Sequence, residues 1–127
     1  MGQPAARQGD LVTAQDSHLV SVGGAPPNPV VLPFSAPLSE GLSTDVRIGG
    51  LPAAVLSSGG TNVPPHLPGP GVFTRPPTNH ATVQTASATV KINGRFAVRN
   101  GDKALTCNDP ADLLNGTVVA AGTVRIG

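Results

Sequence analysis

The chain has 127 residues, which is enough for one domain with a modest hydrophobic core. Its formal net charge is +1, and its eight basic residues are scattered without interleaved aromatic side chains, which gives little support to nucleic-acid binding. A single cysteine excludes an intramolecular disulfide. The first residues show no charged and apolar secretory signal, so we expect a protein that is made in a cytoplasm without a signal peptide.

Glycine and proline are abundant, with 16 and 14 residues, whereas only 12% of the residues are charged. Disordered chains are usually rich in charge, and here the apolar residues alternate in Val-x-Ile runs, as half-buried strands require. We therefore interpret the glycines and prolines as turns between short strands and predict an all-β protein. Only three phenylalanines and no tryptophan or tyrosine are present, so the core should be thin.

A tetrapeptide near the start of the chain is repeated twice further on. Pro4-Ala5-Ala6-Arg7, followed by Gly9-Asp10, returns as Pro52-Ala53-Ala54-Val55 and as Phe96-Ala97-Val98-Arg99, which is followed by Gly101-Asp102. The second and third copies each come after a short β-type run, at 46–48 and 90–92, and another run of this kind lies at 124–126. Such repetition fixes the architecture before single residues are considered.

The order of these runs predicts three units that pack in a ring. The units are 124–127 plus 1–45, then 46–89, then 90–123, and a unit of this size cannot bury an apolar face alone. The last strand would pair with the N-terminal segment and so cover an edge that would otherwise be open. We therefore expect residues 1–127 to form one closed domain.

Three histidines and the cysteine are the residues most able to bind a metal: His18, His66, His80 and Cys107. We expect them in loops, and equivalent loops of a threefold ring converge near its axis. Three imidazole nitrogens and one thiolate form a closed tetrahedral set, which suits one structural Zn²⁺ ion better than Mg²⁺ or Ca²⁺. The simpler interpretation is that the histidines are exposed and the cysteine is a small buried apolar group, because their spacing matches no linear zinc motif.

The repeated tetrapeptide, the Val-x-Ile strands and the Gly-Asp turns together resemble the PAAR-repeat family over residues 3–127. The resemblance implies a small β-rich cone of three pseudo-repeats with zinc near its apex, at the spike tip of a contractile injection machine (type VI secretion or phage-tail-like). His18, His66 and Cys107 fall where that family places its metal ligands. Relatives often have a histidine at the position of Leu32, so either His80 completes the ligand set or only three protein ligands bind.

The resemblance also implies a mechanical function rather than an enzymatic one. Such a cone is made in the bacterial cytoplasm, caps a trimeric spike protein (VgrG-like or tail-spike-like), and is translocated or released with the injection machine. It helps the spike to pierce a target membrane and can carry effector cargo noncovalently. The expected interface with the trimer is formed by alternate residues of the three short runs: Val46, Ile48, Val90, Ile92, Val124 and Ile126.

Two other functions stay open from the sequence alone. One is a metal-free β scaffold or adhesive protein. The other is a small metal-dependent hydrolase, for which Asp16, close to His18, is the available general base. Metal-free protein would favour the scaffold, whereas a hydrolytic activity that is lost on chelation would favour the enzyme.

Overall fold

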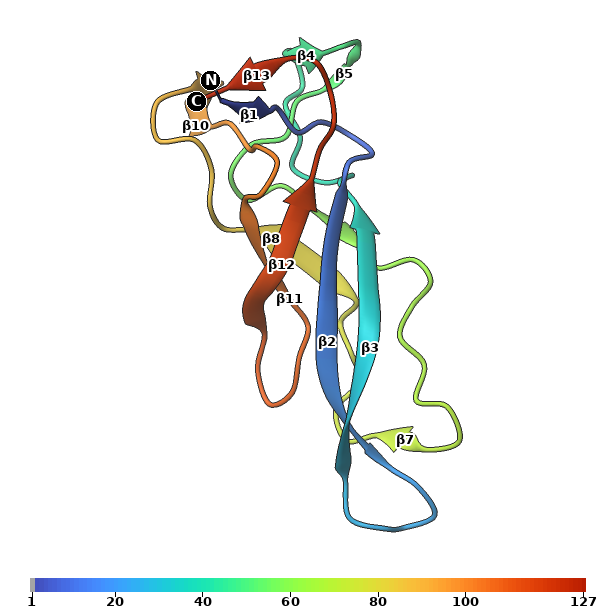
Figure 1. Cartoon of the computed structure of the whole chain (residues 1–127). Helices are drawn as coiled ribbons and strands as arrows, with labels where there is room; N and C mark the ends of the chain where they lie inside the picture. Colours follow the sequence, from blue (N-terminus) through green and yellow to red (C-terminus); the bar gives the residue numbers. More distant parts are fainter. Residues whose placement is uncertain (1) are drawn as a thin grey trace.

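The computed structural model describes residues 2–127, and it confirms the predicted all-β class (Figure 1). Within these residues no helix is long and apolar enough to cross a membrane. The strands in chain order are β1 (Gln3–Pro4), β2 (Leu11–Ser21), β3 (Asn28–Pro37), β4 (Arg47–Ile48), β5 (Leu51–Pro52), β6 (Gly59–Thr61), β7 (Val72–Phe73), β8 (His80–Val83), β9 (Lys91–Ile92), β10 (Arg95–Phe96), β11 (Lys103–Thr106), β12 (Leu113–Val119) and β13 (Arg125–Ile126).

The long strands form one antiparallel sheet in the order β3-β2-β12-β11-β8-β6, with β7 added beside the end of β2. The sheet curls until β6 approaches the chain that follows β3, where Gly59 and Glu40 exchange backbone hydrogen bonds of 3.0 and 3.1 Å. Gly60 permits this approach, because a Cβ there would overlap the carbonyl oxygen of Pro37. The curled sheet therefore encloses a narrow interior against β2 and the second half of β3.

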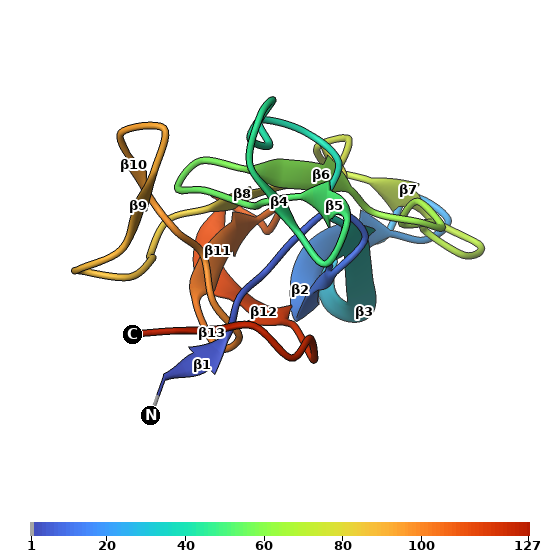
Figure 2. The same cartoon turned by 90° about the horizontal axis from the view of Figure 1, so that it is seen from above.

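Three two-stranded pairs gather at one end of the molecule, which we call the short-strand end (Figures 1 and 2). These are β1 with β13, β4 with β5, and β9 with β10. In the first pair Gln3 lies opposite Ile126 and Pro4 lies opposite Arg125. This pairing confirms the prediction that the C-terminal strand meets the N-terminal segment.

Backbone hydrogen bonds join the three repeated tetrapeptides in a closed ring. The N–H of Ala6 donates to the carbonyl of Val98 (2.9 Å), Val98 donates to Ala54 (3.1 Å), and Ala54 donates to Ala6 (3.0 Å). All three residues are fully buried. A second set of bonds runs around the ring in the opposite direction, from the N–H of Gln8 to Pro52, of Leu56 to Phe96, and of Asn100 to Pro4. The division of the whole chain into three pseudo-repeats remains a prediction.

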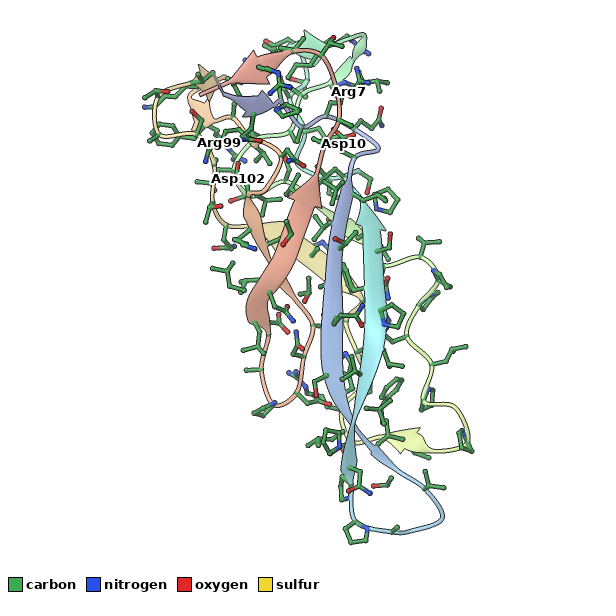
Figure 3. All side chains as sticks on the ribbon, viewed as in Figure 1. Arg7, Asp10, Arg99 and Asp102 are labelled. Atoms are coloured by element: carbon green, nitrogen blue, oxygen red, sulfur yellow. The ribbon has the colours of Figure 1, made fainter. Side chains whose placement is uncertain are left out.

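A similar turn follows each tetrapeptide. The N–H of Arg7 donates to Asp10 Oδ2 (3.0 Å), and the N–H of Arg99 donates to Asp102 Oδ2 (2.7 Å). Figure 3 labels these four residues. The second copy lacks the Gly-Asp pair, but there Ser58 Oγ accepts from the N–H of Val55 (3.0 Å). The residue before each acceptor has positive φ: 89° at Gly9, 77° at Ser57 and 89° at Gly101. Serine therefore closes the same turn without the carboxylate.

The hydrophobic interior is thin, as its composition predicts. The larger cluster contains Phe34 and Leu38, and its other members are mainly alanine and valine. A smaller cluster at the short-strand end consists of Ala5, Ile48 and Ala53, against which Ile92 and Ile126 pack. Backbone hydrogen bonds and polar contacts therefore determine how these segments pack together more than large apolar side chains do.

We predict that Asp102→Ala lowers the free energy of unfolding by about 2 kcal/mol, because this buried carboxylate accepts the backbone N–H and the guanidinium of Arg99. The control is Asp112→Ala, which removes an exposed carboxylate and should change stability by less than about 0.5 kcal/mol. Urea unfolding followed by circular dichroism measures both. Equal losses in the two variants would contradict the role assigned to this turn.

Candidate metal centre

The inner face of β2 changes from apolar to polar along its length. Val12 is buried near the start of the strand, and Asp16, His18 and Val20 are buried further along, at alternate positions. Successive side chains of a strand point to opposite faces, so residues two apart share a face. The strand therefore directs a carboxylate and an imidazole into the enclosed interior, away from the short-strand end.

His66 reaches the same interior from the loop between β6 and β7. Its backbone N–H donates to Asn79 Oδ1 (2.9 Å), and its Nδ1 lies 3.3 Å from Asn62 Nδ2. Asn62 is itself buried and accepts the N–H of Ser35 on β3 (2.8 Å). The side-chain amides of Asn62 and Asn79 thus attach the loop to the sheet and fix the position of the His66 ring.

Cys107 comes directly after β11 and is buried. The residues that follow it are bound to β2, since Asn108 Oδ1 accepts the N–H of Ser17 (2.8 Å) and Asp109 Oδ2 accepts the N–H of Leu19 (2.7 Å). Burial alone would raise the pKa of Asp109, but the N–H of Leu19 and the guanidinium of Arg75 outweigh it and lower that pKa. A charged Asp109 therefore holds this segment against β2.

Four side chains meet where these segments come together: Asp16, His18, His66 and Cys107, which we call the donor cluster. One donor atom from each lies within 4.8 Å of the others, and all four residues are buried. His66 Nε2 is 2.8 Å from Asp16 Oδ2, and Cys107 Sγ is 3.5 Å from the same oxygen. The second oxygen of Asp16 accepts Thr106 Oγ1 (2.6 Å). The four residues lie close enough to hold one metal ion.

His18 is the member of the cluster whose bonding is incomplete. Within residues 2–127 neither of its ring nitrogens has a hydrogen-bond partner, although both are buried, and Nδ1 lies 3.5 Å from Asp109 Oδ2. Burial lowers the pKa of His18, and the nearby ring of His66 lowers it further. A neutral imidazole with a free lone pair is the form that binds metals. A buried polar group without a partner needs an explanation, and a metal ion supplies one.

The charges of the donor cluster also fit a divalent cation. Burial raises the pKa of the Cys107 thiol, and a bound cation counters this by stabilising the thiolate. A thiolate and the Asp16 carboxylate together balance two positive charges, whereas the two imidazoles add none. Metal binding would therefore leave a buried site without net charge, which lowers the cost of burying its ionic members.

The structure does not bring His80 to the donor cluster. His80 lies on β8, where Ala81 and Val83 face inward, and its Nε2 is 2.6 Å from Glu40 Oε1. Its side chain is 41% exposed. His18 likewise belongs to a strand, β2, so the expectation that the histidines occupy loops is met only by His66.

Asp16 takes the fourth place instead. In the register of β2 and β3 it lies directly opposite Leu32, the position at which the resembling family often has a histidine. From the sequence alone, Asp16 is a candidate only as the base of a hydrolase. The signal that identifies it is the alternation of Val12, Ala14, Asp16, His18 and Val20, which predicts one buried strand face.

The predicted interface residues lie at the opposite, short-strand end. Val46, Ile92 and Ile126 are partly buried against the small apolar cluster there, and Ile48 is buried. Val90 precedes β9 and is partly buried, whereas Val124 precedes β13 and is 43% exposed. The structure thus separates the metal candidates from the interface candidates.

Comparison with protein-family models and with curated proteins gave no match for this chain. The geometry above is therefore the basis on which its function is inferred.

We predict that the purified protein binds about one Zn²⁺ ion, and that His18→Ala, His66→Ala and Cys107→Ala each lower the metal content and the melting temperature. His80→Ala is the matched control, because it removes an imidazole that lies outside the donor cluster. Elemental analysis and thermal unfolding measure both quantities.

A second measurement on the unaltered protein guards against variants that fail to fold. Replacement of Zn²⁺ by Co²⁺ should give a thiolate-to-metal absorption band, because Cys107 is the only thiol. Loss of metal from His80→Ala, with a full load retained by the His18 and Cys107 variants, would contradict the assignment of the cluster.

The affinity for Zn²⁺ should increase with pH around neutrality. Because the pKa of the Cys107 thiol is raised, the thiol is protonated there without metal, and binding must release that proton. The lowered pKa of His18 keeps its ring neutral, so it adds little to this dependence. Release of one proton corresponds to about tenfold in affinity per pH unit. Competition with a chromophoric chelator at several pH values measures it, and an affinity independent of pH would argue against a thiolate ligand.

Proposed function

We propose that this protein is a structural tip that caps the trimeric β-helical spike of a contractile injection machine. The observation that carries the proposal is the closed ring of hydrogen bonds between Ala6, Ala54 and Val98, at the end where three short strand pairs gather. Three similar edges around one axis allow a single chain to sit on a true trimer. The resemblance of the tetrapeptides to the PAAR repeat supports the same function.

The donor cluster is a second place, far from the ring of hydrogen bonds, at which distant segments of the chain meet. It joins β2, the loop between β6 and β7, and the segment after β11, which come from widely separated parts of the sequence. A structural Zn²⁺ ion bound by Asp16, His18, His66 and Cys107 would link the three segments and supply the stiffness that a thin core lacks.

A structural function suits the cluster better than catalysis. All four of its residues are buried, and Phe73 and Phe34 pack against the two imidazole rings, with centroid distances of 5.6 Å to His18 and 5.9 Å to His66. A metal-dependent hydrolase needs an accessible position on the metal for water and substrate. The burial of the cluster therefore favours the spike tip over the hydrolase.

We predict that the protein binds the end of a trimeric β-helical spike protein with one chain per trimer. Val124→Asn should weaken this binding about tenfold, because Val124 presents an exposed apolar side chain at the short-strand end. Val31→Asn is the matched control, since Val31 is also exposed but lies on β3, away from that end. Isothermal titration calorimetry gives both the stoichiometry and the affinity. Equal weakening by the two variants, or three chains per trimer, would contradict the proposed docking.

A further inference from the structure

Each of the three short runs at the short-strand end carries a basic residue at its centre: Arg47, Lys91 and Arg125. The register of the three pairs is the same, since these residues lie opposite Pro52, Phe96 and Pro4, the first residues of the three tetrapeptides. In each case the carbonyl of the preceding valine also accepts the N–H of the alanine after that first residue. Three positive charges therefore occupy equivalent positions around the ring.

The alternation of each run separates these charges from the apolar side chains. Arg47, Lys91 and Arg125 are exposed, whereas the neighbouring Ile48 is buried and Ile92 and Ile126 are partly buried in the small apolar cluster. Adjacent residues of a strand face opposite ways, so the basic side chains point away from the axis that the isoleucines approach. We call these three basic residues the cationic rim.

The cationic rim is not neutralised by the protein itself. Arg47 Nη1 donates to the carbonyl of Gly50 (3.1 Å), Arg125 Nη1 donates to that of Gly2 (3.2 Å), and Lys91 Nζ lies 4.9 Å from the centre of the Phe96 ring. These contacts are with uncharged groups. Within residues 2–127 none of the three side chains forms a salt bridge.

Most of the acidic side chains are already engaged by other groups of the protein. Asp16 belongs to the donor cluster, Asp109 binds Arg75, Asp102 binds Arg99, and Glu40 binds His80. Asp45, just before β4, is the acidic residue nearest to the rim in sequence. The three basic residues of the rim are thus exposed and without an acidic partner among residues 2–127, in a protein whose formal net charge is only +1.

A pocket of about 330 Å³ opens beside the cationic rim, and it too has a basic side chain next to apolar ones. Its walls combine the apolar side chains of Leu42, Val55 and Ile92 with Asn93 and the exposed Arg95. Arg95 also forms no salt bridge within the described residues. A carboxylate-bearing side chain from a partner would find apolar contact for its stem and a guanidinium for its head.

We infer that the cationic rim selects the partner: it fits a trimeric protein whose end face has an apolar centre surrounded by exposed carboxylates, one set from each subunit. This inference rests on the proposed function and specifies the chemistry of its partner. Rim charges act mainly on association rate and on the choice of partner, whereas the apolar centre supplies most of the affinity. Like charges on a wrong partner would be repelled at three equivalent points.

The test uses a recombinant trimeric β-helical spike segment in two forms, one with glutamates around its end face and one with glutamine in their place. We expect the protein to bind the glutamate form at least about tenfold more tightly, and the preference to fade as ionic strength rises from about 0.05 M to about 0.5 M. The combined variant Arg47→Glu, Lys91→Glu and Arg125→Glu should lose the preference. Arg47→Lys with Arg125→Lys should keep it, because it preserves the charge.

A matched pair of single variants separates the rim from net charge. Lys91→Glu and Lys103→Glu change the net charge equally and both residues are exposed, but Lys103 lies on β11 of the long sheet. Only Lys91→Glu should weaken binding to the glutamate form, with the melting temperature of each variant as the check on folding.

Equal binding of the two spike forms, weakened alike by Val124→Asn, would overturn the inference and leave the proposed cap intact. Binding to neither form would overturn both. Binding to phosphatidylserine vesicles in place of either spike form would overturn the inference in favour of an anionic lipid surface.

Discussion

The ring of backbone hydrogen bonds between Ala6, Ala54 and Val98 is the constraint on which the rest of this fold depends. Each of these N–H and carbonyl groups is buried, and a buried backbone group without a partner is costly. The bonds form only when three segments far apart in the sequence meet together, and the small side chains of these residues allow that approach. Once the ring is closed, the short strands lie on one side of it and the long strands leave on the other (Figure 1).

The donor cluster fills the far part of the narrow interior, beyond the apolar cluster. The apolar cluster contains few large side chains, so the inner face of β2 continues with Asp16 and His18. An unpartnered buried imidazole costs about 1–3 kcal/mol. A metal ion would give the imidazole of His18 a partner, and it would also cross-link three segments.

The sequence predicted those features that depend on local pattern and repetition. The repeated tetrapeptides predicted which segments would be joined, and the ring of hydrogen bonds involves these residues. Loops of a threefold ring were expected to bring all the metal candidates together, but His80 lies apart from the donor cluster, because strand alternation on β8 turns its side chain outward. Asp16 could have been found from the alternation of β2. The path of the loop that carries His66 could not, since it depends on contacts of Asn62 and Asn79 that join distant segments.

The two ends of the molecule differ in charge, and this difference favours one orientation of the proposed cap. Residues 17–39 and 59–74 contain no Asp, Glu, Lys or Arg, and they include β7 and the connection between β2 and β3, which lie at the end of the molecule opposite the short-strand end (Figure 1). Exposed side chains in these stretches include Val31, Leu67 and Val72. A charged surface must lose its hydration before it enters an apolar medium, whereas an uncharged one loses less. The end with fewer charges is therefore better suited to lead, and the end with the cationic rim, where carboxylates of a partner can offset its charge, to face the partner.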